Sequence, residues 1–385
     1  MRLAIAVLFL ATTATATAQQ TINFNVTTSA DAGAGSLRDV IERANVECYG
    51  AVPCEIRFAA PFAPIELEMP LPAIATCGRL TIGAGGELTQ LPPVVELNGA
   101  HLTSGDGLEV RSRCPNGPSF IEIRRMAIRG FPDAAVGMRA SVGRPEVTVS
   151  ASTIEANGRG IVIDDDSVSA RIHDNVISGN VHSGIFAWAA RDVTIENNTI
   201  ESNGASGIFI GRAIARIHTN TIAFNRDFGI AVSRLSPQCG ATRNSIFENG
   251  WLGIDWELNG RIDDDIPDDA PMPRAPVLTD ARVDPVTKET VVRGIVHAGT
   301  RPGPLLATIH IYKTPASRSH AEGETEVFAF PIPPRVGPID VPFEFRLSRR
   351  IDVSDSILTV QYALSYSFEE GDQNTSEFSN GVRVH

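Results

Sequence analysis

The most polar side chains in the middle of the chain recur at matching positions of successive repeats. They are Arg171, His173, Asp174, Glu196, Arg216 and His218. A carboxylate between two imidazoles, with arginines alongside, could bind an acidic sugar and transfer protons. Strands stacked one above the other would place Asp174 and Glu196 roughly 5 to 7 Å apart, near the spacing of paired glycosidase carboxylates. The alternative is that these charges only solvate the outer face of strands, alternating in sign because like charges repel.

A second position of the same repeats carries aromatic residues, namely Phe186, Trp188 and Phe209. Aromatic rings on an exposed strand face could stack against sugar rings and bind a glycan without turnover. Alternatively, a loop covers them and they are ordinary packing. In this alignment Asp164 lies level with Trp188, one repeat earlier.

Acidic residues suggest one candidate cofactor, calcium. Asp164 and Asp166 could bind Ca²⁺ through oxygen ligands, although consecutive aspartates in a turn are more often only solvated. The same two readings apply to Asp255 with Glu257 and to the acidic segment 263–269. We expect no other cofactor, because no Cys-x-x-Cys pair or clustered histidines accompany the cysteines. The chain also lacks other catalytic signatures, since it contains no Gly-x-Ser-x-Gly, His-Glu-x-x-His or Walker-type motif.

The repeats that would position these groups are marked by asparagine. The phrase Ile-x-x-Asn, followed by Gly-Ile, recurs five times, with Asn157, Asn180, Asn203, Asn225 and Asn249 spaced 22 to 24 residues apart. A second polar column runs through Ser152, Asn175, Asn198, Asn220 and Asn244. We expect asparagine at the turns because it tolerates the left-handed conformation and can hydrogen-bond to the next coil.

This period predicts a parallel β-helix. Each repeat contains short β-prone triplets, and about 23 residues is too short for a pair of helices. A leucine-rich repeat has a similar period, but these units use isoleucine and almost no leucine. Each coil would stack on the previous one at about 4.8 Å. We expect the solenoid to span residues 52–260.

The two ends of the chain differ from the repeats. In the N-terminal capping segment 19–51, Gly35–Asn45 predicts an amphipathic helix with Ser36 as its N-cap, closing the end of the solenoid. Residues 261–275 are acidic and proline-rich, which indicates a linker. Residues 276–385 contain seven short alternating strands, the pattern of an immunoglobulin-like β-sandwich. This sandwich would either cap and space the solenoid or bind glycan.

Thr27–Asn45 resembles the N-terminal capping motif of secreted bacterial right-handed parallel β-helix proteins of the CSLREA type, with Val40 where alanine is usual. The asparagine-containing coils and the segments Pro276–Ala281 and Gly371–Ser379 are similar to the same family. The resemblance implies a pectin-lyase-like fold. It implies no particular activity, because this fold class includes lyases, hydrolases, epimerases and non-catalytic adhesins.

Residues 1–18 read as a cleaved secretory signal peptide, and no later segment is apolar enough to span a bilayer. Export permits disulfides. Cys48 and Cys54 flank a short loop and could form one disulfide. Cys77 and Cys114 each precede a strand, and they could form a second if those strands stack. Cys239 would then remain a free thiol. The 385-residue chain has a net charge of −12, which argues against nucleic acid as a partner.

Three functions remain open. The expected one is a secreted or periplasmic scaffold that presents a flat surface to a polysaccharide or another cell-surface component without catalysis. The alternative is a lyase, hydrolase or epimerase acting on acidic glycans through Arg171, His173, Asp174, Glu196, Arg216 and His218. The third is a carbohydrate-binding protein relying on Phe186, Trp188 and Phe209. The sequence does not indicate an oligomeric state.

Overall fold

The computed structural model describes residues 21–58, 63–83, 95–115, 119–139, 142–262, 272–298, 306–318, 322–333, 339–365 and 374–385. The predicted signal peptide and most of the predicted linker, including the acidic segment 263–269, lie outside these residues. Within the described residues, no helix is long and apolar enough to cross a membrane.

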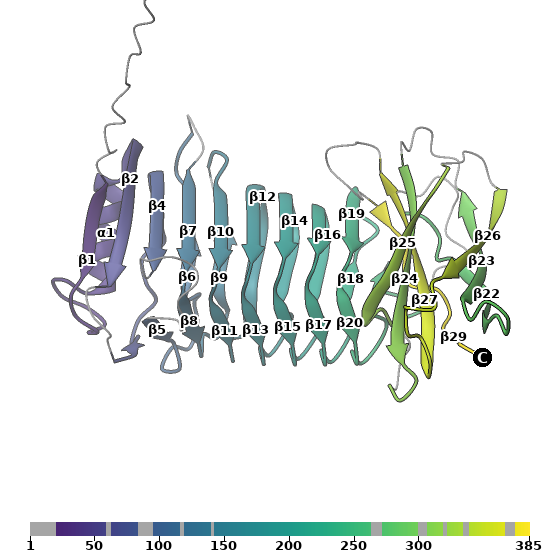
Figure 1. The fold of residues 1–385 in the computed structure, drawn as a ribbon. Coiled ribbons are helices and arrows are strands. Elements are labelled where there is room, and N and C mark those ends of the chain that lie inside the picture. Colours follow the sequence, from purple (N-terminus) through teal and green to yellow (C-terminus); the bar gives the residue numbers. More distant parts are fainter. Residues whose placement is uncertain are drawn as a thin grey trace, which may run out of the picture.

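The larger part of the protein is a right-handed parallel β-helix, as predicted (Figure 1). Its larger sheet has 13 strands: β1 (Ile22–Val26), β2 (Tyr49–Phe58), β4 (Cys77–Gly83), β6 (Leu108–Val110), β7 (Phe120–Arg124), β9 (Ala134–Arg139), β10 (Glu146–Ser150), β12 (Arg159–His173), β14 (Ile185–Glu196), β16 (Ile208–His218), β18 (Ile230–Val232), β19 (Gln238–Thr242) and β21 (Ile254–Trp256). Its second sheet has eight: β3 (Ile65–Glu66), β5 (Val95–Asn98), β8 (Met126–Arg129), β11 (Thr153–Glu155), β13 (Val176–Ser178), β15 (Thr199–Glu201), β17 (Thr221–Ala223) and β20 (Ser245–Phe247).

Buried isoleucine and asparagine hold the coils in register. Ile154, Ile177 and Ile200 pair across neighbouring strands and are fully buried. At the next turn, Nδ2 of Asn180 donates to Oδ1 of Asn203 at 2.9 Å, and its backbone N–H donates to the same oxygen at 3.2 Å. The other asparagines of both columns form equivalent bonds, so the predicted asparagine ladders are present.

The left-handed residue of each turn is not the ladder asparagine. It is the residue before it, as at Asp174 (φ 57°), Asn197 (φ 55°) and Ser202 (φ 56°). The expectation that the ladder asparagines adopt the left-handed region was therefore wrong. Their place is fixed instead by the hydrogen bonds that each buried amide makes to the neighbouring coils.

The N-terminal end is closed by α1 (Leu37–Glu47), which is the predicted helix. Ser36 is its N-cap and accepts a hydrogen bond from Asp39 N, and Leu37, Val40, Ile41 and Ala44 are buried. The sequence did not reveal β1, which pairs in parallel with β2 and brings the start of the sheet to Ile22. The sheet therefore begins before the predicted start at residue 52.

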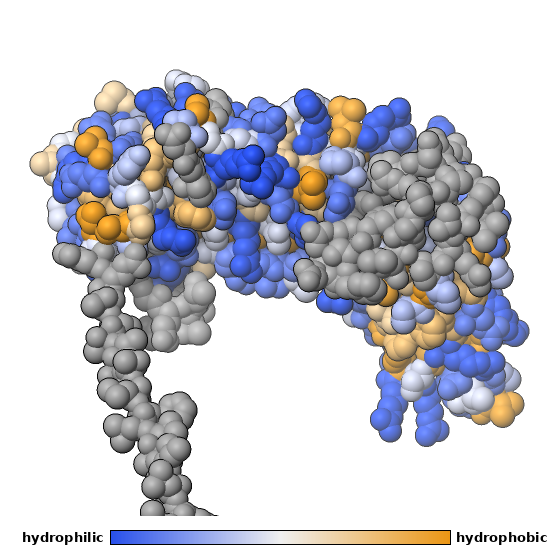
Figure 2. Space-filling model, turned by 90° about the horizontal axis from the view of Figure 1, so that it is seen from above, coloured by the Kyte–Doolittle hydropathy of each residue, from blue (hydrophilic) through white to orange (hydrophobic). Residues whose placement is uncertain are grey.

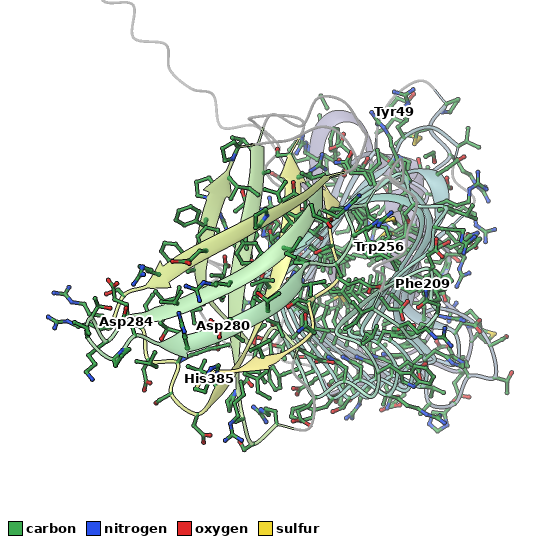
Figure 3. All side chains as sticks on the ribbon, turned by 90° about the vertical axis from the view of Figure 1, so that its right-hand side faces the viewer. Tyr49, Phe209, Trp256, Asp280, Asp284 and His385 are labelled. Atoms are coloured by element: carbon green, nitrogen blue, oxygen red, sulfur yellow. A yellow bond between two sulfur atoms is a disulfide. The ribbon has the colours of Figure 1, made fainter. Side chains whose placement is uncertain are left out.

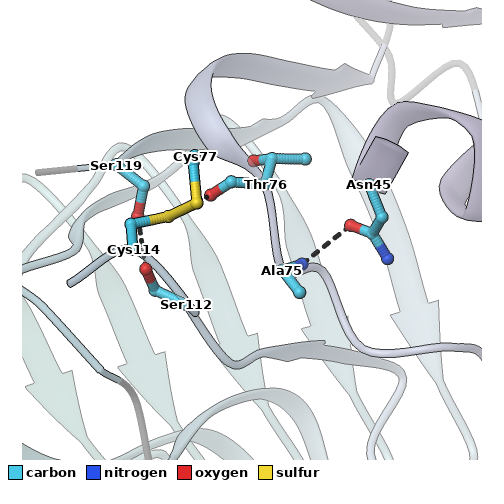
Figure 4. The surroundings of a disulfide bond; sticks show 7 residues. All are labelled: Asn45, Ala75, Thr76, Cys77, Ser112, Cys114 and Ser119. Atoms are coloured by element: carbon cyan, nitrogen blue, oxygen red, sulfur yellow. Dashed lines mark hydrogen bonds between the residues drawn. A yellow bond between two sulfur atoms is a disulfide. The ribbon is translucent and has the colours of Figure 1, made fainter. Parts of the chain in front are cut away.

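Both predicted disulfides form. Cys48 and Cys54 are joined across their short loop, with their Cα atoms 5.9 Å apart. Cys77 and Cys114 bridge two coils near the N-terminal end, with a Cα distance of 5.3 Å (Figure 4). Cys239 lies buried with its thiol outside these disulfides, and burial raises its pKa to about 12. It is therefore protonated and unreactive at neutral pH.

The C-terminal part is a small antiparallel β-sandwich, also as predicted. One sheet contains β22 (Val277–Val283), β23 (Thr290–Ala298) and β26 (Ile339–Leu347). The other contains β24 (Leu306–Pro315), β25 (Thr325–Ile332), β27 (Ser356–Ser365), β28 (Asn374–Thr375) and β29 (Val382–Arg383). Side chains from both sheets, including Val292, Ile309 and Val360, form one buried core.

The sandwich continues the hydrogen bonding of the last coil. Ile246 N donates to Gly323 O at 2.9 Å, and Trp256 N donates to Oε1 of Glu377 at 2.7 Å. Asn249 Nδ2, at the end of its ladder, donates to Oε2 of Glu322 at 3.4 Å. Figure 3 views this end, with the sandwich in front of the stacked coils. The sandwich thus caps the solenoid, because it supplies acceptors that another coil would otherwise provide.

Candidate functional site

Three aromatic side chains form a row on the outside of the solenoid, which we call the aromatic strip: Phe186, Trp188 and Phe209. Phe186 on β14 pairs in register with Phe209 on β16, as the repeat predicted. Their rings stack with centroids 4.8 Å apart and 15° between their planes. Trp188 stacks on Phe209 at 6.1 Å and is 37% exposed. The rings therefore present a continuous surface that no loop among the described residues fully covers.

The aromatic strip differs from the predicted alignment at Trp188. Asp164 pairs with Ala189, and the register shifts between Ile163 and Asp164. Trp188 is therefore the extra residue of a bulge, and Asp164 does not lie level with it. A bulge changes the direction of a side chain. Here the indole lies beside Phe209 on the following strand.

Arg159 belongs to the same surface, although sequence analysis missed it. Its guanidinium lies 5.1 Å from the centroid of the Phe186 ring, a cation–π contact. Arg159 starts β12, one coil before Phe186, and lies directly before the Gly-Ile phrase, where the later coils carry Ser183, Ser206, Phe228 and Leu252 instead of arginine. The repeat therefore contained no signal for it. The face of the solenoid seen from above is mostly hydrophilic, with separate hydrophobic patches (Figure 2).

The predicted polar side chains form a second row, the charged column: Arg171, His173, Asp174, Glu196, Arg216 and His218. The strand register places His173, Glu196 and His218 next to one another on three successive strands, as the repeat predicted. Arg171 and Arg216 lie level with each other on either side of Thr194.

The charged side chains of this column are paired, mostly within the column and, for Arg216, with Asp192. Glu196 accepts from Nε of Arg171 at 2.6 Å, and its other oxygen lies 3.5 Å from Nε2 of His218. His173 Nδ1 lies 2.7 Å from the Asp174 carboxylate, and Arg216 donates to Asp192 at 2.7 Å. Asp174 and Glu196 thus face different partners. This arrangement resembles a ladder of surface ion pairs, and a catalytic role for the charged column stays a hypothesis.

The predicted acidic residues separate into two environments. Asp164 and Asp166 are exposed, and their role as calcium ligands stays untested. Asp255 is fully buried and accepts from the backbone N–H groups of Asn259 at 3.1 Å and Gly260 at 2.7 Å. Asp255 therefore shapes the turn after β21, and Glu257 is paired with Arg234 at 2.6 Å.

A comparison with protein families finds one partial match. The family described as "Periplasmic copper-binding protein (NosD)" matches residues 121–252, about a third of the chain and entirely within the solenoid. A search of the curated proteins finds no match.

Two solved tailspike structures resemble the chain weakly. The Dettilon tailspike protein is 12% identical, with 85% of each chain covered and a TM-score of 0.27. Tailspike protein 2 from Escherichia coli O157:H7 bacteriophage CAB120 is 10% identical, with a TM-score of 0.28. That comparison covers 89% of this chain and 65% of the other. Similarity at this level says nothing about activity.

The residues present do not fit a copper site. Copper prefers imidazole, thiolate and thioether ligands. Within the matched segment, Met126, Met138 and Cys239 are buried in the core, and His182 is exposed in the connection between β13 and β14. His173 and His218 are separated by the strand that carries Glu196. Among the described residues, no three His, Cys, Asp or Glu side chains form a group that could hold a metal ion.

Proposed function

We propose that the protein is an exported, non-catalytic β-helix scaffold that binds a glycan at its cell surface or in its surroundings through the aromatic strip. The observation that carries this proposal is the stacked, partly exposed row of Phe186, Phe209 and Trp188. Exposed apolar patches rimmed by polar residues are typical of interaction sites. Flat rings on consecutive strands would meet consecutive sugar rings of a polysaccharide.

The guanidinium of Arg159 adds a hydrogen-bond donor at one end of the aromatic strip. It stays charged at any physiological pH, so it would favour a glycan carrying hydroxyl or acidic groups near that end. The charged side chains of the charged column already form ion pairs with neighbouring side chains. The charged column would then mainly keep the outer face hydrated and prevent other chains from pairing with its strands.

Export is supported by two features. The N-terminal sequence has the pattern of a cleaved signal peptide. The chain also contains two disulfides, which persist in oxidising compartments such as the periplasm or the extracellular space.

The test is a screen of the purified mature protein against acidic and neutral polysaccharides, with binding, reducing ends and unsaturated products all measured. We expect binding without turnover, and a loss of about fivefold in affinity on Trp188→Ala, since an aromatic contact contributes on the order of 1 kcal/mol. The matched control is Phe224→Ala, a residue 51% exposed at a turn away from the aromatic strip. Turnover lost in Glu196→Gln would instead establish an enzyme.

A further inference from the structure

A cavity of about 300 Å³ lies where the last coil meets the sandwich. Its walls come from three stretches of chain: the turn before β21, the segment that follows β21, and the sandwich residues beside β25 and β28. The residues that matter for its chemistry are Trp251, Ile254, Ile262, Glu322, Glu377 and Phe378. The walls are thus largely apolar and aromatic, with two carboxyl groups among them.

Glu322 is the unusual member of this cavity. It is 4% exposed, and its Oε2 accepts from Asn249, while its Oε1 has no hydrogen-bond partner among the described residues. Glu377 is 2% exposed, with one carboxylate oxygen held by Trp256 N. No lysine, arginine or histidine is among the described residues that line the cavity. Among the described residues that line the cavity, Glu322 therefore has no cationic side chain beside it.

A buried carboxyl group without a cation is costly, because a low-dielectric environment disfavours its charged form. A positively charged ligand would remove this cost. The aromatic rings favour an organic cation over a metal ion: Trp251 is 56% exposed and Phe378 lines the inner wall. Ammonium groups are attracted to the faces of such rings.

We propose that this cavity binds a small organic ammonium ion, with its charge beside Glu322 and its apolar part against Trp251 and Phe378. The volume is at the lower end of ligand pockets, so it would hold one small molecule or one side-chain-sized group. This site is independent of the aromatic strip, which lies on other coils. Either proposal can therefore fail without the other.

The charge state of Glu322 supplies a specific readout. Burial raises its pKa to about 8, although the Asn249 hydrogen bonds oppose this shift. At pH 7 the carboxyl group is therefore mostly protonated, and an ammonium ion bound beside it would lower its pKa. Binding would then release up to about 0.9 proton per ligand at pH 7.

The experiment is isothermal titration calorimetry of the full mature chain with choline, and with 3,3-dimethylbutan-1-ol as an uncharged ligand of the same shape. Titrations in buffers of different ionisation enthalpy measure the protons released. We expect choline to bind with proton release and the alcohol to bind at least about tenfold more weakly without it. Glu322→Gln keeps an acceptor for Asn249 but removes the charge, and should weaken choline binding at least about tenfold.

Two further variants keep the test valid if Glu322→Gln perturbs the cap. Trp251→Ala changes an exposed wall residue and should also weaken choline binding, whereas Phe224→Ala, an exposed aromatic residue of the preceding coil, should not. The proposal is overturned if the alcohol binds as well as choline, if Trp251→Ala leaves choline binding unchanged, or if choline produces no heat. Binding of CaCl₂ alone, abolished by Glu322→Gln, would also overturn it.

Discussion

Replacing one ladder asparagine should destabilise the protein far more than an ordinary polar substitution. Asn203 is 1% exposed, and its side chain makes four hydrogen bonds. Its Oδ1 accepts from the backbone N–H and Nδ2 of Asn180, and its Nδ2 donates to Ile177 O at 3.2 Å and to Asn225 Oδ1 at 2.9 Å.

The magnitude follows from what alanine leaves behind. In Asn203→Ala, Asn180 Nδ2 still donates a hydrogen bond to Ile154 O. Asn225 Oδ1 still accepts a hydrogen bond from the backbone N–H of residue 203. The backbone N–H of Asn180 loses its acceptor, whereas the carbonyl of Ile177 loses one donor but keeps its place in the parallel pairing of β13 with β15. One unsatisfied buried group costs about 1–3 kcal/mol and a lost hydrogen bond costs about 1 kcal/mol, so we expect the free energy of unfolding to fall by about 3 kcal/mol.

The assay is urea unfolding followed by far-ultraviolet circular dichroism, with the free energy taken from the midpoint and slope. Asn23→Ala is the matched control, because Asn23 is exposed and its side-chain bond to Thr21 O is 3.5 Å long. It should change the free energy by less than about 0.5 kcal/mol. A loss below about 1 kcal/mol for Asn203→Ala would refute the reasoning that the ladder holds the coils together.

Two other predictions concern the ends of the solenoid. Burial raises the pKa of Glu322 from 4.5 to about 8, and the charge of Glu248 adds to the rise. Between these two pH values the carboxyl group is therefore protonated in the folded state but ionised in the unfolded state. Stability should therefore fall as pH rises from about 4.5 to about 8, and Glu322→Gln should flatten this decline in unfolding measured across that range. Replacing Cys77 and Cys114 by serine should lower the free energy of unfolding by about 4 kcal/mol, whereas replacing Cys48 and Cys54 should lower it by about 2 kcal/mol. The difference arises because the Cys77–Cys114 bridge closes the longer loop. Equal losses in denaturant unfolding would contradict this ranking.

Most of the solenoid could be predicted because its contacts repeat. A column such as His173, Glu196 and His218 needs only the spacing of the asparagines to be aligned, and the strand register agrees with it residue by residue. The alignment failed at Trp188, where a single inserted residue forms a bulge. A repeat fixes the average period but does not say where within a coil an extra residue is accommodated.

The contacts at the ends could not be predicted, because they join segments that share no repeat. β1 pairs with a strand that follows α1, and Glu322 meets Asn249 across 73 positions of sequence. Asp255 looked like a solvated surface residue, yet its carboxylate is buried in a turn that its own hydrogen bonds create. Such features depend on the folded arrangement of distant segments rather than on local pattern.

The most direct test of the proposed function compares Phe209→Ala with Glu196→Gln on one polysaccharide that the native protein binds, with affinity and product formation measured in the same samples. We predict that Phe209→Ala, which removes the ring contacting both Phe186 and Trp188, weakens binding about tenfold. Glu196→Gln should leave affinity unchanged, and neither sample should accumulate product. Normal binding by Phe209→Ala, or product formation that Glu196→Gln abolishes, would contradict the account.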